Sequence, residues 1–188
     1  HAKGYHIFAE AALKYKKIDS RWNFIAIGNE ARKEIFFDKK IVKEIGYKKN
    51  SDVLKYYSKS EIAIGNSVWD EPLGRIAIEA SSRKCLPIIS NKGGLTESKN
   101  IALVLKENTS TELVNILKKI TKNKSLRRQK QKYFYKNNNF EIKSISKMLD
   151  SSRAEIIESR KDKYFSDKKR ILHIANFNEN SDGRLFYS

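Results

Sequence analysis

The chain has 188 residues, a formal net charge of +17 and 39% hydrophobic residues, including nine Tyr and nine Phe. This length and apolar content suit one folded domain with a core and exclude a disordered chain, while the single Cys85 excludes a disulfide framework. No apolar run is long enough to span a membrane and no signal peptide is visible, so we expect a cytoplasmic protein.

Apolar periodicity predicts helices that alternate with short strands along most of the chain. The predicted strands cover residues 22–27, 41–45, 61–64, 86–89 and 101–105, with a short strand or packed turn at 35–37. The predicted helices cover residues 3–17, 51–57 (capped by Ser51 and Asp52), 72–80, 109–120 (capped by Thr109 or Ser110), 125–136 and 140–160. This alternation is typical of a parallel sheet, so we predict an α/β fold, a Rossmann-like doubly wound domain.

The stretch from residue 69 to 97 contains a loop, a helix, a buried strand and a glycine loop. Pro72, with acidic Glu71 ahead of it, is typical of a helix N-terminus. Gly74 leaves backbone N–H groups uncovered at this start, so an anionic group can approach them. Cys85 precedes the strand, where a packed thiol is expected rather than a nucleophile.

Gly93 and Gly94 follow that strand and form a second loop of the same kind. Ligands of open α/β sheets bind outside the carboxyl ends of the strands, where both loops are expected to lie. Glu71 and Glu79 flank the first loop, and carboxylates suit vicinal hydroxyls of a ribose or hexose rather than phosphates.

The setting E-P-L-G-R-x-A-x-E-A, followed by L-P-I-I-S-N-K-G-G-L-T-E, resembles the nucleotide-sugar motif of group 1 glycosyltransferases. These are retaining enzymes with the GT-B fold, and the resemblance covers residues 1–160. It includes Lys3-Gly4 at the start of the first helix and Gly46-Tyr47 in the base-binding loop. The fold implied is the donor-binding half of a GT-B enzyme.

The resemblance implies two catalytic residues and several that bind the donor. Glu71 would orient the transferred sugar, and Lys3 would stabilise the departing nucleotide diphosphate as negative charge develops. Glu79 would bind the ribose. The alternatives are a helix-capping Glu71, a solvated Lys3 and a surface Glu79.

Other positions follow from the same resemblance. The backbone amides of Leu73, Gly74 and Arg75 would hold the diphosphate, with the Arg75 side chain as a second phosphate contact or an exposed helix arginine. The backbone beside Tyr47 would read the base while its ring faces the core. Gly93 and Gly94 would lie near the sugar or phosphate or only shape a turn. No metal and no cofactor are expected at this site.

The reaction implied is transfer of a hexosyl group from a nucleotide diphosphate sugar to an acceptor, with retention, in carbohydrate biosynthesis. The family has a strand and an arginine shortly before the position of Lys3, and neither is present. We therefore expect a window cut from a longer protein, without its acceptor-binding N-terminal domain and inactive alone.

The expected organisation has a nucleotide-sugar-binding domain (1–122), C-terminal helices (123–160), a polar linker (161–169) and the start of a following domain (170–188). Residues 170–176 resemble the opening strand of a second glycosyltransferase unit. The alternative is a tail strand that pairs with this domain's own sheet.

The positive charge suggests two further partners, which are nucleic acid and an anionic membrane surface. Most basic residues are Lys rather than Arg, which is the better residue for phosphate forks and base edges. We therefore do not expect nucleic acid as a partner and interpret most lysines as solvated surface. For the basic run 118–136, peripheral contact with the inner membrane face is the alternative.

Three rival functions stay open beside the glycosyltransferase. The first is a non-catalytic sugar-nucleotide binder, and the second is a basic nucleic-acid-binding domain. The third, a dinucleotide-dependent oxidoreductase, is disfavoured because no G-x-G-x-x-G follows any predicted strand.

Overall fold

The structure is a computed structural model that describes residues 2–28, 41–138 and 142–164. It contains two compact units, His1–Ile142 and Lys143–Ser188. The elements of the first unit are α1 (Tyr5–Lys16), β1 (Phe24–Ala26), β2 (Val42–Glu44), α2 (Asn50–Lys59), β3 (Ile62–Gly65), α3 (Ile76–Ser82), β4 (Leu86–Ser90), the 3₁₀ helix η1 (Gly93–Ser98), β5 (Leu103–Leu105), α4 (Ser110–Lys122) and α5 (Lys124–Lys136).

The strands that the structure describes in the first unit form two parallel sheets. One has two strands in the order β1-β2, and the other has three in the order β3-β4-β5. Ile88 of β4 is opposite Ile64 of β3 on one side and Leu103 of β5 on the other. Parallel strands joined by helices confirm the predicted α/β class.

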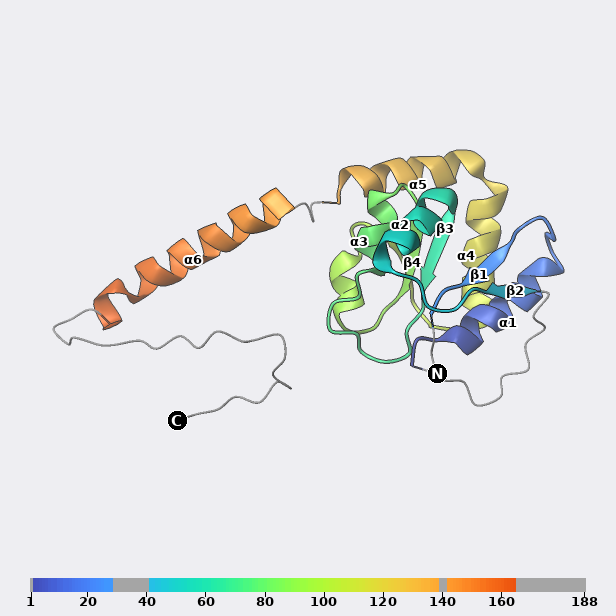
Figure 1. Ribbon diagram of the computed structural model, residues 1–188, viewed down its shortest axis with the longest axis horizontal. Helices are drawn as coiled ribbons and strands as arrows, with labels where there is room; N and C mark the ends of the chain where they lie inside the picture. The colour runs from blue at the N-terminus through green and yellow to red at the C-terminus, as the bar shows by residue number, and fades with distance from the viewer. Residues whose placement is uncertain (1, 29–40, 139–141, 165–188) are drawn as a thin grey trace. The chain divides into compact units, whose positions relative to one another are not determined.

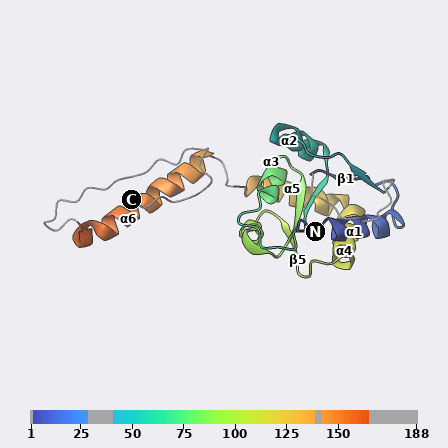
Figure 2. The same ribbon diagram turned by 60° about the horizontal axis from the view of Figure 1, so that its bottom comes forward.

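Helices cover both faces of the sheets. Helix α1 packs against α4, and α2 packs against α3, which in turn contacts β3 and β4. Figures 1 and 2 show the α1–α4 pair and the α2–α3 pair on different sides of the strands. Helix α5 contacts α3, α4 and β4, and its Gln131 donates to the backbone of Glu61 at the amino end of β3. The amino ends of the strands are therefore covered by α5, whereas their carboxyl ends face the opposite side.

The centre of the core is β4, in which all five residues are buried. This strand has a strand on each side and helices on its faces, which explains its continuous apolar run. Cys85, just ahead of it, is fully buried, as expected. Helix α1 turns Ile7, Ala12 and Tyr15 toward the core, where they are buried.

Two helix starts differ from the sequence-based predictions. Helix α3 begins at Ile76 rather than beside Pro72, because Gly74 takes a left-handed φ of +68° that a right-handed helix does not allow. Helix α2 begins at Asn50, so Ser51 lies within the first turn and does not cap it. The Thr109 cap of α4 is confirmed, because its Oγ1 accepts from the backbone N–H of Glu112 at 3.2 Å.

The second unit contributes helix α6 (Ile142–Tyr164). Its last residues overlap the start of the predicted linker at 161–169. The predicted elements at 35–37 and 170–176 lie outside the described residues. Among the helices that the structure describes, none is both long and apolar enough to cross a bilayer.

Candidate functional site

The segment ahead of α1 lies against the carboxyl end of β3. The side-chain amide of Asn66 donates to the carbonyl of Gly4 at 2.8 Å, and the N–H of Val68 donates to the carbonyl of Ala2 at 2.9 Å. A Cβ at position 4 would stand 1.9 Å from the carbonyl oxygen of Asn66, and Gly4 has a φ of +70°. Glycine is therefore required here, and this contact places Lys3 beside the loop that follows β3.

Lys3 and Glu71 form an ion pair in this place. Lys3 Nζ lies 2.5 Å from Glu71 Oε1, and the Lys3 side chain is 58% exposed against 14% for Glu71. The ammonium also stands 5.3 Å from the ring centroid of Trp69. Burial raises the pKa of the Glu71 carboxyl, but the hydrogen bond and charge of Lys3 outweigh it, so this pKa lies below its usual value. The carboxylate is thus ionised at neutral pH and oriented by one lysine.

Gly93 and Gly94 position the loop that carries Glu71. The N–H of Gly94 donates to the carbonyl of Glu71 at 2.6 Å. A Cβ at Gly93 would stand 2.5 Å from the Glu71 carbonyl oxygen, and one at Gly94 would stand 2.2 Å from that of Pro72. Both contacts are with main chain, so these two glycines allow a close approach that no other residue permits.

Glu79 lies one helical turn after the start of α3. Its Oε1 accepts from the side-chain amide of Asn50 at 3.0 Å and lies 3.7 Å from Nε of Arg75. The pKa of Tyr57 is raised, first by burial and then by the negative charge of Glu79. Glu79 itself does not line the cavity described next, but it lies close to Tyr57 and Arg75, which do.

One polar part of a cavity of about 980 Å³ lies at this end of the strands. Lys3, Glu71, Gly74 and Arg75 line that part, and Tyr47 lies at its border. The Tyr47 side chain is 73% exposed, so the prediction that it faces the core is wrong. Its neighbour Gly46 has a φ of +67°, in the left-handed region, in the loop that follows β2.

The structure therefore brings five of the nine expected site residues to one cavity. The other four do not border it: Leu73, Glu79, Gly93 and Gly94. Leu73 is 44% exposed, and Glu79 reaches the site through Arg75. Sequence reasoning missed Asn50 and Trp69, because neither contact follows from a spacing along the chain.

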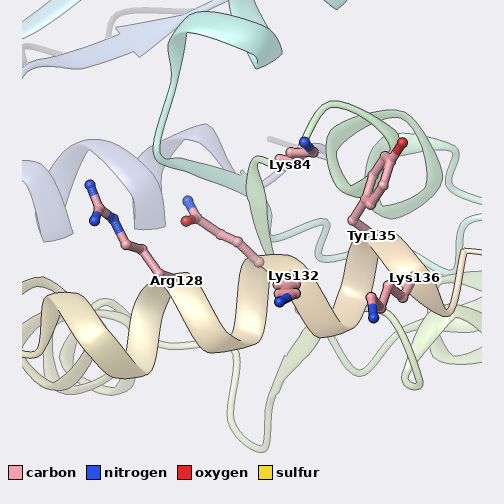
Figure 3. A pocket seen from close by; sticks show the side chains of 6 residues that line it. Lys84, Arg128, Lys132, Tyr135 and Lys136 are labelled. Atoms are coloured by element: carbon pink, nitrogen blue, oxygen red, sulfur yellow. The ribbon is translucent and has the colours of Figure 1, made fainter.

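A second hollow, of about 370 Å³, is strongly basic (Figure 3). Its lining consists of Lys84, Arg128, Gln131, Lys132, Tyr135 and Lys136. Figure 3 shows Lys84 across from Tyr135 of α5, and its ammonium lies 5.0 Å from that ring centroid. This hollow lies at the amino ends of the strands, away from the Lys3–Glu71 pair. Within residues 2–28, 41–138 and 142–164, no group of three His, Cys, Asp or Glu is placed to hold a metal ion.

Comparison with known proteins identifies a family for this arrangement. The model of the family "Glycosyl transferases group 1" matches residues 1–137. A search of the curated proteins finds no match.

Several solved structures are similar to this chain. The Anabaena protein HepE in complex with UDP-glucose matches with a TM-score of 0.66 and 18% identity over 84% of this chain and 46% of HepE. A glycosyltransferase from Rickettsia africae matches with a TM-score of 0.68 and 21% identity, over 84% of this chain and 45% of that one. The C-terminal domain of a group 1 glycosyl transferase from Francisella tularensis matches with a TM-score of 0.63 and 21% identity, over 72% of this chain and 77% of that domain's chain.

The chain thus spans less than half the length of the first two proteins. At these identities the similarity shows the fold, which is the Rossmann-like fold of GT-B glycosyltransferases.

Proposed function

This chain belongs to the group 1 glycosyl transferases, and we propose that it is the donor-binding portion of a retaining enzyme that transfers a hexosyl group from a nucleotide diphosphate sugar to an acceptor. The observation that carries this proposal is the oriented Lys3–Glu71 pair at the polar part of a large cavity. A cation beside a half-buried carboxylate offers one group for a diphosphate and one for sugar hydroxyls.

The proposed chemistry divides between these two side chains. The Lys3 ammonium neutralises the charge that develops on the nucleotide diphosphate as it leaves. The Glu71 carboxylate stays ionised because its pKa is lowered, so it accepts hydrogen bonds from hydroxyls of the transferred sugar. On donor binding, Lys3 divides its contacts between Glu71 and the diphosphate.

The remaining donor contacts come from α3 and from residues 73–75, which lead into it. Glu79 binds the two ribose hydroxyls in place of its present donor Asn50. The amides of Leu73, Gly74 and Arg75 contribute to the diphosphate site together with Lys3. Gly93 and Gly94 act indirectly, through the main chain of the Glu71 loop.

A binding experiment tests these roles. UDP-glucose is the first donor to test, because the similar HepE structure contains it, followed by guanosine and adenosine diphosphate sugars. Titration calorimetry should give weak but saturable binding to the wild-type chain. Lys3→Met should weaken it about 10- to 100-fold, the loss expected for one charge-assisted hydrogen bond.

Lys14→Met provides the matched control, because Lys14 also forms an ion pair, with Glu10 at 2.8 Å on α1. It should leave donor affinity unchanged. Equal effects of the two substitutions, or no binding by any donor, would overturn the proposed function.

We further propose that this chain binds donor without transferring it. What supports this is that the chain spans less than half of HepE and of the Rickettsia africae glycosyltransferase. On this proposal the acceptor-binding half belongs to another part of the protein. Detectable glycosyl transfer by the 188-residue chain alone would contradict this. A full-length protein that binds donor but neither hydrolyses nor transfers it would instead favour the non-catalytic sugar-nucleotide binder.

The basic hollow on α5 supports a peripheral contact with an anionic membrane. Lys84, Arg128, Lys132 and Lys136 supply the charge, and Tyr135 supplies an aromatic ring of the kind enriched at membrane interfaces. Co-sedimentation should be stronger with vesicles rich in phosphatidylglycerol than with phosphatidylcholine alone, and should fall with added salt. Equal sedimentation with both kinds of vesicle would contradict the proposed membrane contact.

A further inference from the structure

The basic hollow carries positive charge that no acidic group nearby neutralises. Its four cations are Lys84, Arg128, Lys132 and Lys136. Among the described residues, none of these four forms an ion pair with a carboxylate. Glu61 also lies at this end of the strands, but its carboxylate already accepts from Arg127 Nε and from Gln131 Nε2, each at 3.1 Å. The hollow is therefore suited to an anion from outside the chain.

Three of these cations stand in one row along α5. Arg128, Lys132 and Lys136 are four residues apart, so their side chains are neighbours on one face of the helix. Like charges at this spacing repel one another, and α5 contains no Asp or Glu that would reduce the repulsion. The helix dipole favours a cation in the last turn, which accounts for Lys136 but not for the other two. A bound anion would relieve the repulsion along the whole row.

Lys84 stands at a position where glycine is usual. Its φ of +58° is left-handed, and no other described residue besides the glycines has a positive φ. The N–H of Lys84 donates to the carbonyl of Ser81 at 3.0 Å, two residues before the C-cap of α3. The next N–H, of Cys85, donates to the carbonyl of Ala80 at 3.0 Å, which completes a Schellman motif. A side chain costs conformational energy at this place in the motif, and glycine avoids that cost.

The Lys84 side chain completes the charge of the hollow from the side opposite α5. Figure 3 shows it facing that helix from the segment that precedes β4, and its ammonium lies 5.0 Å from the ring centroid of Tyr135. A cation–π contact at an exposed site is weak, so it offsets only part of the backbone cost. The contact also holds a fourth cation across from the row on α5. The Tyr135 hydroxyl adds a hydrogen-bond donor to the lining.

The charge and the size of the hollow indicate the chemical class of its ligand. A volume of about 370 Å³ suits a compact group. A phosphomonoester is compact, carries a charge of about −1.5 to −2 at neutral pH and presents three acceptor oxygens. Such oxygens match the planar fork of Arg128 and the point charges of the lysines. A phosphodiester has one negative charge and two free oxygens, so fewer of the four cations would contact it.

We propose that the basic hollow between Lys84 and helix α5 is a binding site for a phosphomonoester group, borne either by a soluble phosphate ester or by a lipid headgroup such as that of phosphatidic acid. A nucleotide diphosphate sugar has no such group, and the hollow lies away from the Lys3–Glu71 pair. The assignment therefore does not rest on the proposed glycosyl transfer. It narrows the proposed membrane contact to one kind of headgroup.

Methyl phosphate and dimethyl phosphate are the soluble probes, because they differ in charge but little in size. Each is titrated at constant ionic strength into the isotope-labelled 188-residue chain, and amide chemical shifts are followed. Methyl phosphate should shift residues 84 and 128–136 and bind at least about 10-fold more tightly than dimethyl phosphate. Equal affinity for the two probes, or shifts that spread over the lysine-rich surface, would overturn the proposal.

Lys84→Gly separates binding from stability. Glycine relieves the left-handed position, so the thermal midpoint should stay the same or rise, while the affinity for methyl phosphate should fall by at least about 3-fold. Lys132→Met, at an exposed helix position, should lower the affinity by a similar factor. Lys119→Met is the matched control, because it removes one charge from α4 outside the lining and should leave the affinity unchanged. Equal affinity losses in all three variants would mean diffuse attraction and would overturn the site.

Vesicles of matched surface charge identify the source of the phosphate group. One kind contains phosphatidic acid, a phosphomonoester, and the other contains phosphatidylglycerol, a phosphodiester. Stronger co-sedimentation with phosphatidic acid that Lys84→Gly abolishes would assign the site to a lipid headgroup. Equal co-sedimentation, with binding of methyl phosphate retained, would assign it to a soluble phosphate ester. Stronger co-sedimentation with phosphatidylglycerol would contradict the preference for a monoester.

Discussion

Gly93→Ala tests how the Glu71 loop is held. Gly93 has a φ of +47°, and a Cβ there would stand 2.5 Å from the carbonyl oxygen and 2.7 Å from the nitrogen of Glu71. The left-handed conformation alone costs an alanine about 1–2 kcal/mol. The close main-chain atoms cannot move without shifting the loop, which adds about 1–3 kcal/mol of overpacking. The total expected loss of unfolding free energy is therefore about 2–5 kcal/mol.

Gly46→Ala separates the two contributions. Gly46 has a similar left-handed φ of +67°, but beyond its chain neighbours no heavy atom lies within 4 Å of the place that a Cβ would take. This substitution should cost only the conformational part, about 1–2 kcal/mol. Urea unfolding of both variants measures the difference. A loss for Gly93→Ala no larger than that for Gly46→Ala would refute the claim that the glycine is needed for close approach to Glu71.

Three further predictions concern the fold and its titrating groups. Arg127→Met should lower the free energy of unfolding, measured in urea, by about 2–4 kcal/mol. The nearly buried guanidinium donates to two carbonyls of α4, and its Nε lies 3.1 Å from Glu61 Oε2. The control Arg128→Met, at an exposed position, should lower it by less than about 0.5 kcal/mol. Cys85 should react with a thiol reagent only as fast as the chain unfolds, because the thiol is buried and because burial and the charge of Glu61 raise its pKa to about 12. Rapid reaction under native conditions would contradict this prediction. The folded-state pKa of Glu71 lies below its usual 4.5, so the contribution of Glu71 to stability is present above pH 4.5 and is lost as pH falls through the lowered pKa. Glu71→Gln should therefore flatten the dependence of the thermal midpoint on pH in that acid range. An unchanged slope would contradict this prediction.

The order of elements was predictable because apolar periodicity is strong in this chain. The buried strand predicted at 86–89 and the helix predicted over 3–17 correspond to β4 and α1. The start of α3 could not be predicted from the sequence. Pro72 is typical of a helix start, but the left-handed backbone of Gly74 delays the helix to Ile76. Such a conformation depends on contacts with η1, where Leu95 lies against Gly74, and these are distant in sequence.

The site could be predicted as a set of residues but not as a geometry. Lys3 and Glu71 were each expected to contact the donor, yet nothing in their spacing indicates that they pair with one another. Their contact depends on Asn66 and Gly4, which bring the start of the chain to the end of β3. The prediction that Tyr47 faces the core fails for a related reason. Its exposure depends on how the chain leaves β2 rather than on local periodicity.

The central claim is that the donor binds beside Lys3, Glu71 and Glu79. A titration of the isotope-labelled chain with UDP-glucose, followed by amide chemical shifts, tests it most directly. The account predicts that shifts concentrate at residues 2–4 and 71–79. Shifts confined to residues 84 and 128–136, around the basic hollow, would contradict it.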